Sequence, residues 1–96
     1  MHNIKQGLSQ KYFMGTATFE ELKKSMIDLF YAVKMDQDQL NVVVQTSKNY
    51  LSKVDIAKHE FPDNSKEIDK FAKWLRTDYL KMINTAAKPY GMKFML

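Results

Sequence analysis

The chain has 96 residues, which is enough for one domain and too few for two. It contains no cysteine, which excludes disulfides and thiolate chemistry, and no apolar run is long enough to span a membrane. Its formal net charge of +4 favours anionic partners, with nucleic acid first.

The N-terminal segment, residues 1–17, carries lysines but no acidic residue. Its beginning lacks the apolar centre of a signal peptide, so we expect a cytoplasmic protein. The segment also contains Tyr12, Phe13 and Met14. Either an arm that reaches toward nucleic acid or a short packed helix fits this composition.

A helix is expected over residues 19–34. Thr18 followed by Glu21 forms a capping box, in which each side chain accepts a hydrogen bond from the other residue's backbone N–H. At about 100° per residue, the apolar residues share one stripe of this helix. They are Phe19, Leu22, Met26, Leu29, Phe30 and Val33.

A second helix is expected to begin at Gln37, where the Asp36 side chain can cap it. Its inward residues are Leu40, Val43 and Val44. Three consecutive β-branched residues at 42–44 are poor helix formers, but the run is short and polar residues flank it on both sides.

The segment QTSKNYLSKV, residues 45–54, predicts a third helix that continues to about His59. Its apolar positions share one side, at Tyr50, Leu51 and Val54. Its polar residues form a row on the other side, at Lys48, Asn49, Ser52 and Lys53. This row is either a surface that reads a partner or a solvated helix face.

A long last helix is expected over residues 65–88. Pro62 stops the preceding structure, and Asn64 with Glu67 forms a second possible capping box. Pro89 ends the helix. Its apolar face consists of Ile68, Phe71, Ala72, Leu75, Tyr79, Met82, Ile83 and Ala86.

The C-terminal residues from Tyr90 onward are largely apolar. Tyr90, Met92, Phe94 and Leu96 fit a dimerising segment, a peptide that docks in a partner's groove, or a tail folded back on the core. The sequence as a whole predicts an all-α, compact single domain of four to five helices.

Residues 36–55 read DQDQLNVVVQTSKNYLSKVD. This segment resembles the helix-turn-helix of phage-repressor-type proteins (Cro/cI or Xre-like), whose pattern runs roughly T-Q-x-x-L-A-x-x-x-G-V-S-x-x-Y-L-S-x-I-E. Without a gap, Gln37, Leu40, Ser47 and Tyr50 fall on the matching family residues.

The resemblance covers residues 19–75 and leaves 76–96 as a helix extension with an apolar tail. Three positions depart from the family pattern. Asn41 stands where alanine is preferred, Asp36 replaces threonine, and Gln45 stands where glycine usually provides the turn.

The resemblance implies a sequence-specific DNA-binding transcriptional regulator that reads the major groove of double-stranded DNA with residues 46–54. Asparagine can pair with adenine and lysine can reach guanine acceptors, which suits this role. A homodimer is expected, because one recognition helix contacts few bases. The expected DNA-contacting residues are Gln37, Thr46, Ser47, Lys48, Asn49, Ser52 and Lys53.

A second basic face follows the last helix, with Lys66, Lys70, Lys73 and Lys81 on it and Trp74 at its edge. It fits a phosphate backbone, an acidic protein surface or an ordinary solvated face. The alternative function is therefore a small helical protein-interaction module, an inhibitor or adaptor of phage or mobile-element origin. Such a module would use Trp74 with the lysines, or the C-terminal tail.

Catalysis finds little support in the sequence. His59-Glu60 is not followed by a second histidine at zinc spacing, and the other histidine, His2, is near the N-terminus. The sequence has no glycine-rich phosphate loop and no serine with a convincing His/Asp pattern. We expect no enzyme, no cofactor, no metal, no small-molecule substrate and no membrane partner.

Overall fold

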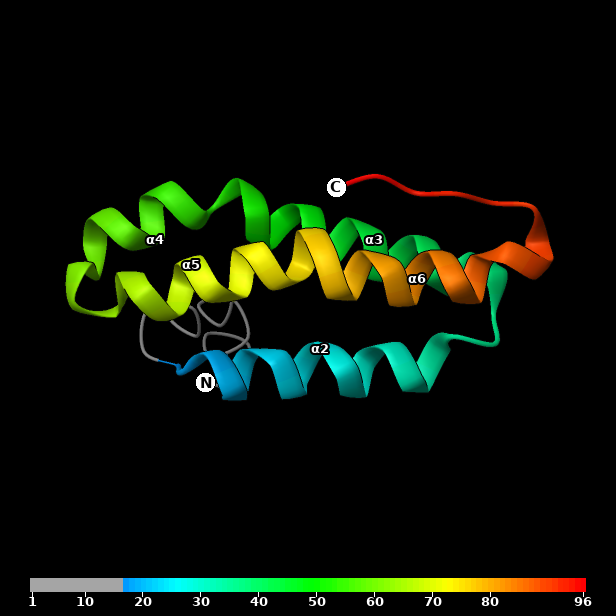
Figure 1. The fold of residues 1–96 in the computed structure, drawn as a ribbon, viewed down its shortest axis with the longest axis horizontal. Helices are drawn as coiled ribbons and strands as arrows, with labels where there is room; N and C mark the ends of the chain where they lie inside the picture. The colour runs from blue at the N-terminus through cyan, green and yellow to red at the C-terminus, as the bar shows by residue number, and fades with distance from the viewer. Residues whose placement is uncertain (1–16) are drawn as a thin grey trace, which may run out of the picture.

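The computed structural model describes residues 17–96, and every regular element in this range is a helix, as predicted. Three helical arms run in alternating directions along the molecule (Figure 1). The arms comprise α2 (Phe19–Val33), then α3 (Gln37–Ser52) with α4 (Val54–Glu60), then α5 (Ser65–Trp74) with η2 (Leu75–Tyr79) and α6 (Leu80–Ala87). Short 3₁₀ turns are η1 (Pro62–Asn64) and η3 (Lys88–Tyr90).

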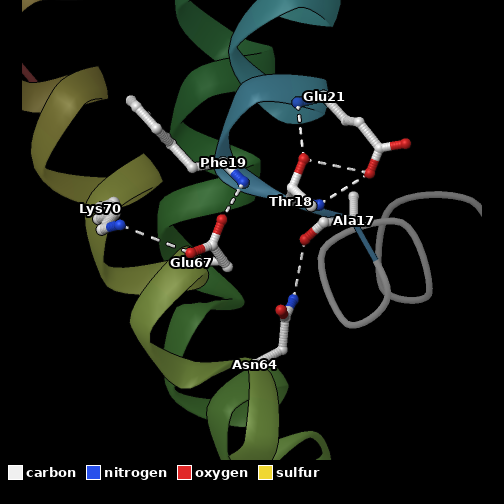
Figure 2. A network of polar contacts seen from close by, with 7 residues as sticks. All are labelled: Ala17, Thr18, Phe19, Glu21, Asn64, Glu67 and Lys70. Atoms are coloured by element: carbon white, nitrogen blue, oxygen red, sulfur yellow. Dashed lines mark hydrogen bonds and ion pairs between the residues drawn. The ribbon is translucent and has the colours of Figure 1, made fainter.

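The start of α2 is fixed by side chains from two places in the chain (Figure 2). The predicted capping box is confirmed: the Glu21 N–H donates to Thr18 Oγ1 (3.2 Å), and the Thr18 N–H donates to Glu21 Oε1 (2.8 Å). Glu67 Oε1 of α5 accepts from the Phe19 N–H (2.7 Å), and Asn64 Nδ2 of η1 donates to the Ala17 carbonyl (2.9 Å). The carboxylates of Glu21 and Glu67 also lie at the positive end of the α2 dipole.

This arrangement corrects one prediction. Asn64 makes no side-chain cap for α5, so the capping box expected between Asn64 and Glu67 does not form. Both side chains instead join the α2 N-terminus to the start of α5. The N-terminal arm or short helix expected over 1–17 lies, apart from Ala17, outside the described residues.

The segment Gln37–Ser52 forms one continuous helix, which corrects the expected break between a second and a third helix. Asp36 caps it as predicted, accepting from the N–H groups of two first-turn residues. No turn interrupts it at Gln45, and among the described residues only Gly91 has positive φ. A helix-turn-helix within residues 36–55 is therefore not confirmed.

The physical reason for the unbroken helix is a single buried face. Val43, Val44, Ser47 and Tyr50 continue the inward stripe of Leu40 at helical spacing. A turn at this point needs a residue that adopts a left-handed backbone easily, and Gln45 does not. The segment therefore gains more from uninterrupted helical hydrogen bonds than from a turn.

The third arm contains a π turn, which the apolar spacing explains. Ala87 follows Ile68 by 19 residues, and both side chains are buried. Five regular α-helical turns contain about 18 residues, so the apolar spacing is one residue too long for a regular helix. The π turn at Leu75–Tyr79 takes up the extra residue and keeps Tyr79 and later residues on the inward face. One consequence differs from the prediction: Ala87 is buried, whereas Met82 and Ala86 are only half-buried.

Trp74 belongs to the core and not to the interface face beside the lysines, where its position in the sequence placed it. Its side chain is 7% exposed. Its ring centroid lies 4.9 Å from that of Tyr79, 6.2 Å from Phe71 and 6.3 Å from Phe19. Phe19 comes from α2, so the contact that covers Trp74 joins two arms of the bundle.

The C-terminal tail folds back along the bundle (Figure 1). Gly91, with φ of 70°, reverses the chain after η3, a conformation that costs glycine little. Asn84 then holds the tail, because its Nδ2 donates to the Phe94 carbonyl (3.0 Å) and its Oδ1 accepts from the Phe94 N–H (2.7 Å). Of the three expectations for the tail, the fold shows this packing, with Met92, Phe94 and Leu96 half-buried against the core.

Candidate functional site

The expected DNA-contacting residues all lie on α3 or immediately after it, but they differ in accessibility. Gln37, Lys48 and Ser52 are exposed, while Thr46, Asn49 and Lys53 are half-buried. Ser47 is fully buried, and its Oγ donates to the Val43 carbonyl at 3.0 Å. Its expected contact with DNA is therefore wrong, because Ser47 is part of the core face of α3.

The other side chains do not converge on one narrow surface. On a continuous helix, Thr46 and Lys48 point about 160° apart. Several polar groups also have partners within the chain: Thr46 Oγ1 donates to the Val42 carbonyl (2.8 Å) and Gln37 Nε2 donates to Met92 Sδ (3.1 Å). The exposed part of α3 thus resembles an ordinary polar helix surface more than a set of side chains directed toward one partner.

The second basic face is partly as expected. Its four lysines, Lys66, Lys70, Lys73 and Lys81, are all exposed. Lys70 Nζ lies 3.6 Å from Glu67 Oε2, a contact also drawn in Figure 2. Without Trp74, this face offers charge but no aromatic anchor.

The most distinctive surface feature is an apolar groove between the end of α2 and α6, with a volume of about 700 Å³. α2 contacts α3 and α5, and α6 contacts α3, so both walls rest on α3. Phe30, Met82 and Ala86 lie along the groove, and Pro89 and Tyr90 line the part formed by η3.

Three large side chains are exposed at the groove. Tyr31 is 59% exposed, Met35 is 83% exposed and Tyr90 is 36% exposed. Tyr90 Oη donates to the Met35 carbonyl (2.9 Å), which joins η3 to the turn after α2 and bridges the two walls. An exposed cluster of aromatic and methionine side chains is typical of a protein-binding surface.

Charged groups line the groove on both walls. Lys34 comes from the α2 side, and Lys81 and Asp78 come from the opposite side. Lys34 Nζ lies 4.6 Å from the centre of the Tyr31 ring, a cation–π contact that holds the amine over the groove. Among the described residues, no ion pair joins Asp78 to either lysine.

A second hollow, of about 440 Å³, lies between the α3–α4 arm and the α5–η2 segment. Its walls include Lys58 and Asp69, which form a 2.8 Å ion pair. The hydrogen bond that Lys58 Nζ donates to Asp69 Oδ1 raises the pKa of Lys58 above its ordinary value. Because Lys58 and Asp69 form an ion pair with each other, this hollow is a weaker candidate for binding a partner than the apolar groove.

The sequence reasoning missed Tyr31 and Met35. The signal was present, because Tyr31 lies about 120° from Phe19 on the helical wheel, outside the apolar stripe. A tyrosine outside the apolar stripe is a candidate anchor for a partner surface, because tyrosine is enriched among interface hot spots. Met82 and Ala86 carried no such signal, because at about 100° per residue they fall in the middle of the predicted apolar face, and only the π turn moves them to the edge where they line the groove.

In residues 17–96, no three His, Cys, Asp or Glu side chains lie close enough to hold a metal ion. No helix in the same range is long and apolar enough to cross a membrane. No family model, no curated protein and no solved structure matches the chain.

Proposed function

We propose that this chain is a small helical protein-interaction module that holds a segment of a partner protein in the groove between α2 and α6. The observation that carries the proposal is the exposure of Tyr31, Met35 and Tyr90 around one apolar groove. Tyrosine is enriched among the residues that dominate binding energies, and methionine adapts its shape to a partner.

The proposal differs from the alternative that the sequence suggested. Trp74 is buried and the C-terminal tail packs on its own bundle, so neither is presented to a partner. The groove uses other residues, although Tyr90 and Lys81 belong to both descriptions.

Selection of a phage-displayed library of helical peptides against the folded protein tests the proposal. We expect the selected peptides to lose roughly tenfold or more affinity when Tyr31 or Met35 is changed to serine. Matched controls are Val42→Ser and Ile56→Ser, which remove apolar side chains 47% and 55% exposed on α3 and α4. Equal losses in the controls, or no selected binder, would contradict the proposal.

DNA binding by the exposed surface of α3 is a second candidate function. Its support is that residues 39–54 contain Lys48 and Lys53 and no acidic residue. An unbroken helix can enter a major groove. The homodimer expected for this function would then have to present two copies of α3 at the spacing of DNA half-sites. Titration with labelled duplex DNA at several salt concentrations tests this candidate.

A further inference from the structure

The groove's own polar groups restrict what can occupy it. Thr85 Oγ1 donates to the Lys81 carbonyl (2.8 Å), and Tyr90 Oη donates to the Met35 carbonyl (2.9 Å). Two of the three hydroxyl groups that line the groove, those of Thr85 and Tyr90, therefore use their protons within the chain, and the third belongs to Tyr31. An extended segment would bring backbone N–H and C=O groups that need partners here, whereas a helix satisfies these groups internally. The occupant that fits is a helix.

The charges at the groove restrict the sequence of that helix. A helix resting between the walls would have Lys34 on one flank and Lys81 on the other, with Asp78 as the single carboxylate lining the groove. The net positive rim continues the positive charge of the whole chain. Acidic residues on both flanks of the apolar stripe complement this rim.

A second copy of this chain is a poor occupant. The other exposed large apolar residues of the described range are Val42 on α3, Ile56 on α4 and Met95 in the C-terminal tail. None of them belongs to an apolar stripe of several turns on a helix. Apart from the groove itself, a second copy would thus have no apolar helix face to place there.

We infer that the groove takes a partner helix whose apolar stripe is flanked on both sides by acidic residues. This inference rests on the proposed function and specifies its partner. Lys34 and Lys81 determine the preference for acidic flanks, while the apolar residues provide the affinity common to all helical occupants.

Three fluorescein-labelled peptides test the inference, each with the same leucine stripe at helical spacing and with glutamate, glutamine or lysine on its flanks. Binding to the full chain is measured by anisotropy at two salt concentrations. We expect the glutamate peptide to bind best. The Lys34→Gln/Lys81→Gln protein should lose roughly threefold to tenfold affinity for it, while binding of the glutamine peptide stays unchanged.

Lys66→Gln/Lys70→Gln is the matched control, because it removes the same net charge from α5, more than about 15 Å along the helix from Lys81. Screening makes this pair ineffective at physiological salt. If all three peptides bind equally, or the control pair has the same effect, the acidic-flank inference is wrong and the proposed groove function stands. If no peptide binds, or if the protein self-associates and Tyr31→Ser abolishes that association, both are wrong.

Discussion

At the residue scale, Tyr79 connects the third arm to α2 through both its ring and its hydroxyl group. It is fully buried, and its hydroxyl donates to the Met26 carbonyl at 2.6 Å. Its ring also packs against Phe30 and Trp74, with centroid distances of 6.1 Å and 4.9 Å. One residue thus combines aromatic packing with a hydrogen bond between elements far apart in the chain.

We expect Tyr79→Phe to lower the free energy of unfolding by about 1 kcal/mol, because the ring stays and one buried hydrogen bond is lost. Urea denaturation followed by circular dichroism measures this change. Tyr90→Phe is the control, since it removes a similar bond to the Met35 carbonyl at a more exposed position. A smaller loss for Tyr79→Phe than for Tyr90→Phe would contradict the assignment.

The Tyr79→Phe variant should also differ from the wild type in how its stability changes at alkaline pH. Burial raises the pKa of Tyr79 above its ordinary value, so the folded state holds the hydroxyl proton more tightly than the unfolded chain does. Stability is then fully present below pH about 10 and declines as pH rises above it. The decline should be shallower in Tyr79→Phe, although not absent, because burial also raises the pKa of Tyr50.

At the element scale, the π turn η2 compensates for an apolar pattern that is one residue too long for five regular turns. Its exposed residues, Arg76, Thr77 and Asp78, contribute little to the core. Asp78 lines the apolar groove, whereas Arg76 and Thr77 line the second hollow, so the turn lies between the two concave surfaces.

Deleting Thr77 should convert the π turn into regular α-helix and leave Tyr79, Ile83 and Ala87 on the core side. We expect the free energy of unfolding to stay within about 1 kcal/mol of the wild-type value, because the core is unchanged. Backbone chemical shifts would report α-helix throughout residues 65–87.

Deleting Gln45 from α3 is the control for this prediction. It also removes one exposed residue, but α3 has no π turn to absorb the change. Ser47 and Tyr50 would rotate by about 100° relative to the preceding turns and leave the core. The Gln45 deletion should therefore unfold the protein. If the Thr77 deletion lowers the free energy of unfolding equally, η2 does not simply absorb an extra residue.

At the scale of the whole molecule, positive charge is concentrated toward the C-terminus. Residues 65–96 contain six lysines, Arg76 and three acidic residues. The candidate DNA-binding surface of α3 and the lysines of α5 therefore compete as the origin of any attraction to DNA. Net charge alone predicts weak, non-specific binding.

If α3 binds duplex DNA, affinity should fall steeply with salt, and Lys48→Gln/Lys53→Gln should reduce the log–log salt slope by roughly 2. Fluorescence anisotropy with the duplex upstream of the gene and with a random duplex measures this. Lys66→Gln/Lys70→Gln is the comparison variant. A change of slope in the comparison variant alone would assign the binding to the α5 lysines, and no binding at low salt would exclude the DNA function.

The features that depend on neighbours along the chain follow from the amino-acid sequence alone. The helical class, the capping of α2 by Thr18 and Glu21, the capping of α3 by Asp36 and most of the apolar stripes follow from interactions within about four residues. The exposure of Lys48 and Ser52 followed from the same periodicity, so these parts of the candidate surfaces were predictable.

The features that depend on residues far apart in the chain follow from the tertiary packing. Phe19 covers Trp74, and the uninterrupted inward face of α3 removes the turn that a matching sequence pattern suggested. The groove exists because α2 and α6 both rest on α3 without closing against each other. The spacing of residues along the sequence indicates which face of a helix is apolar. It does not indicate which of these apolar residues a neighbouring helix leaves uncovered, and the uncovered residues form the candidate site.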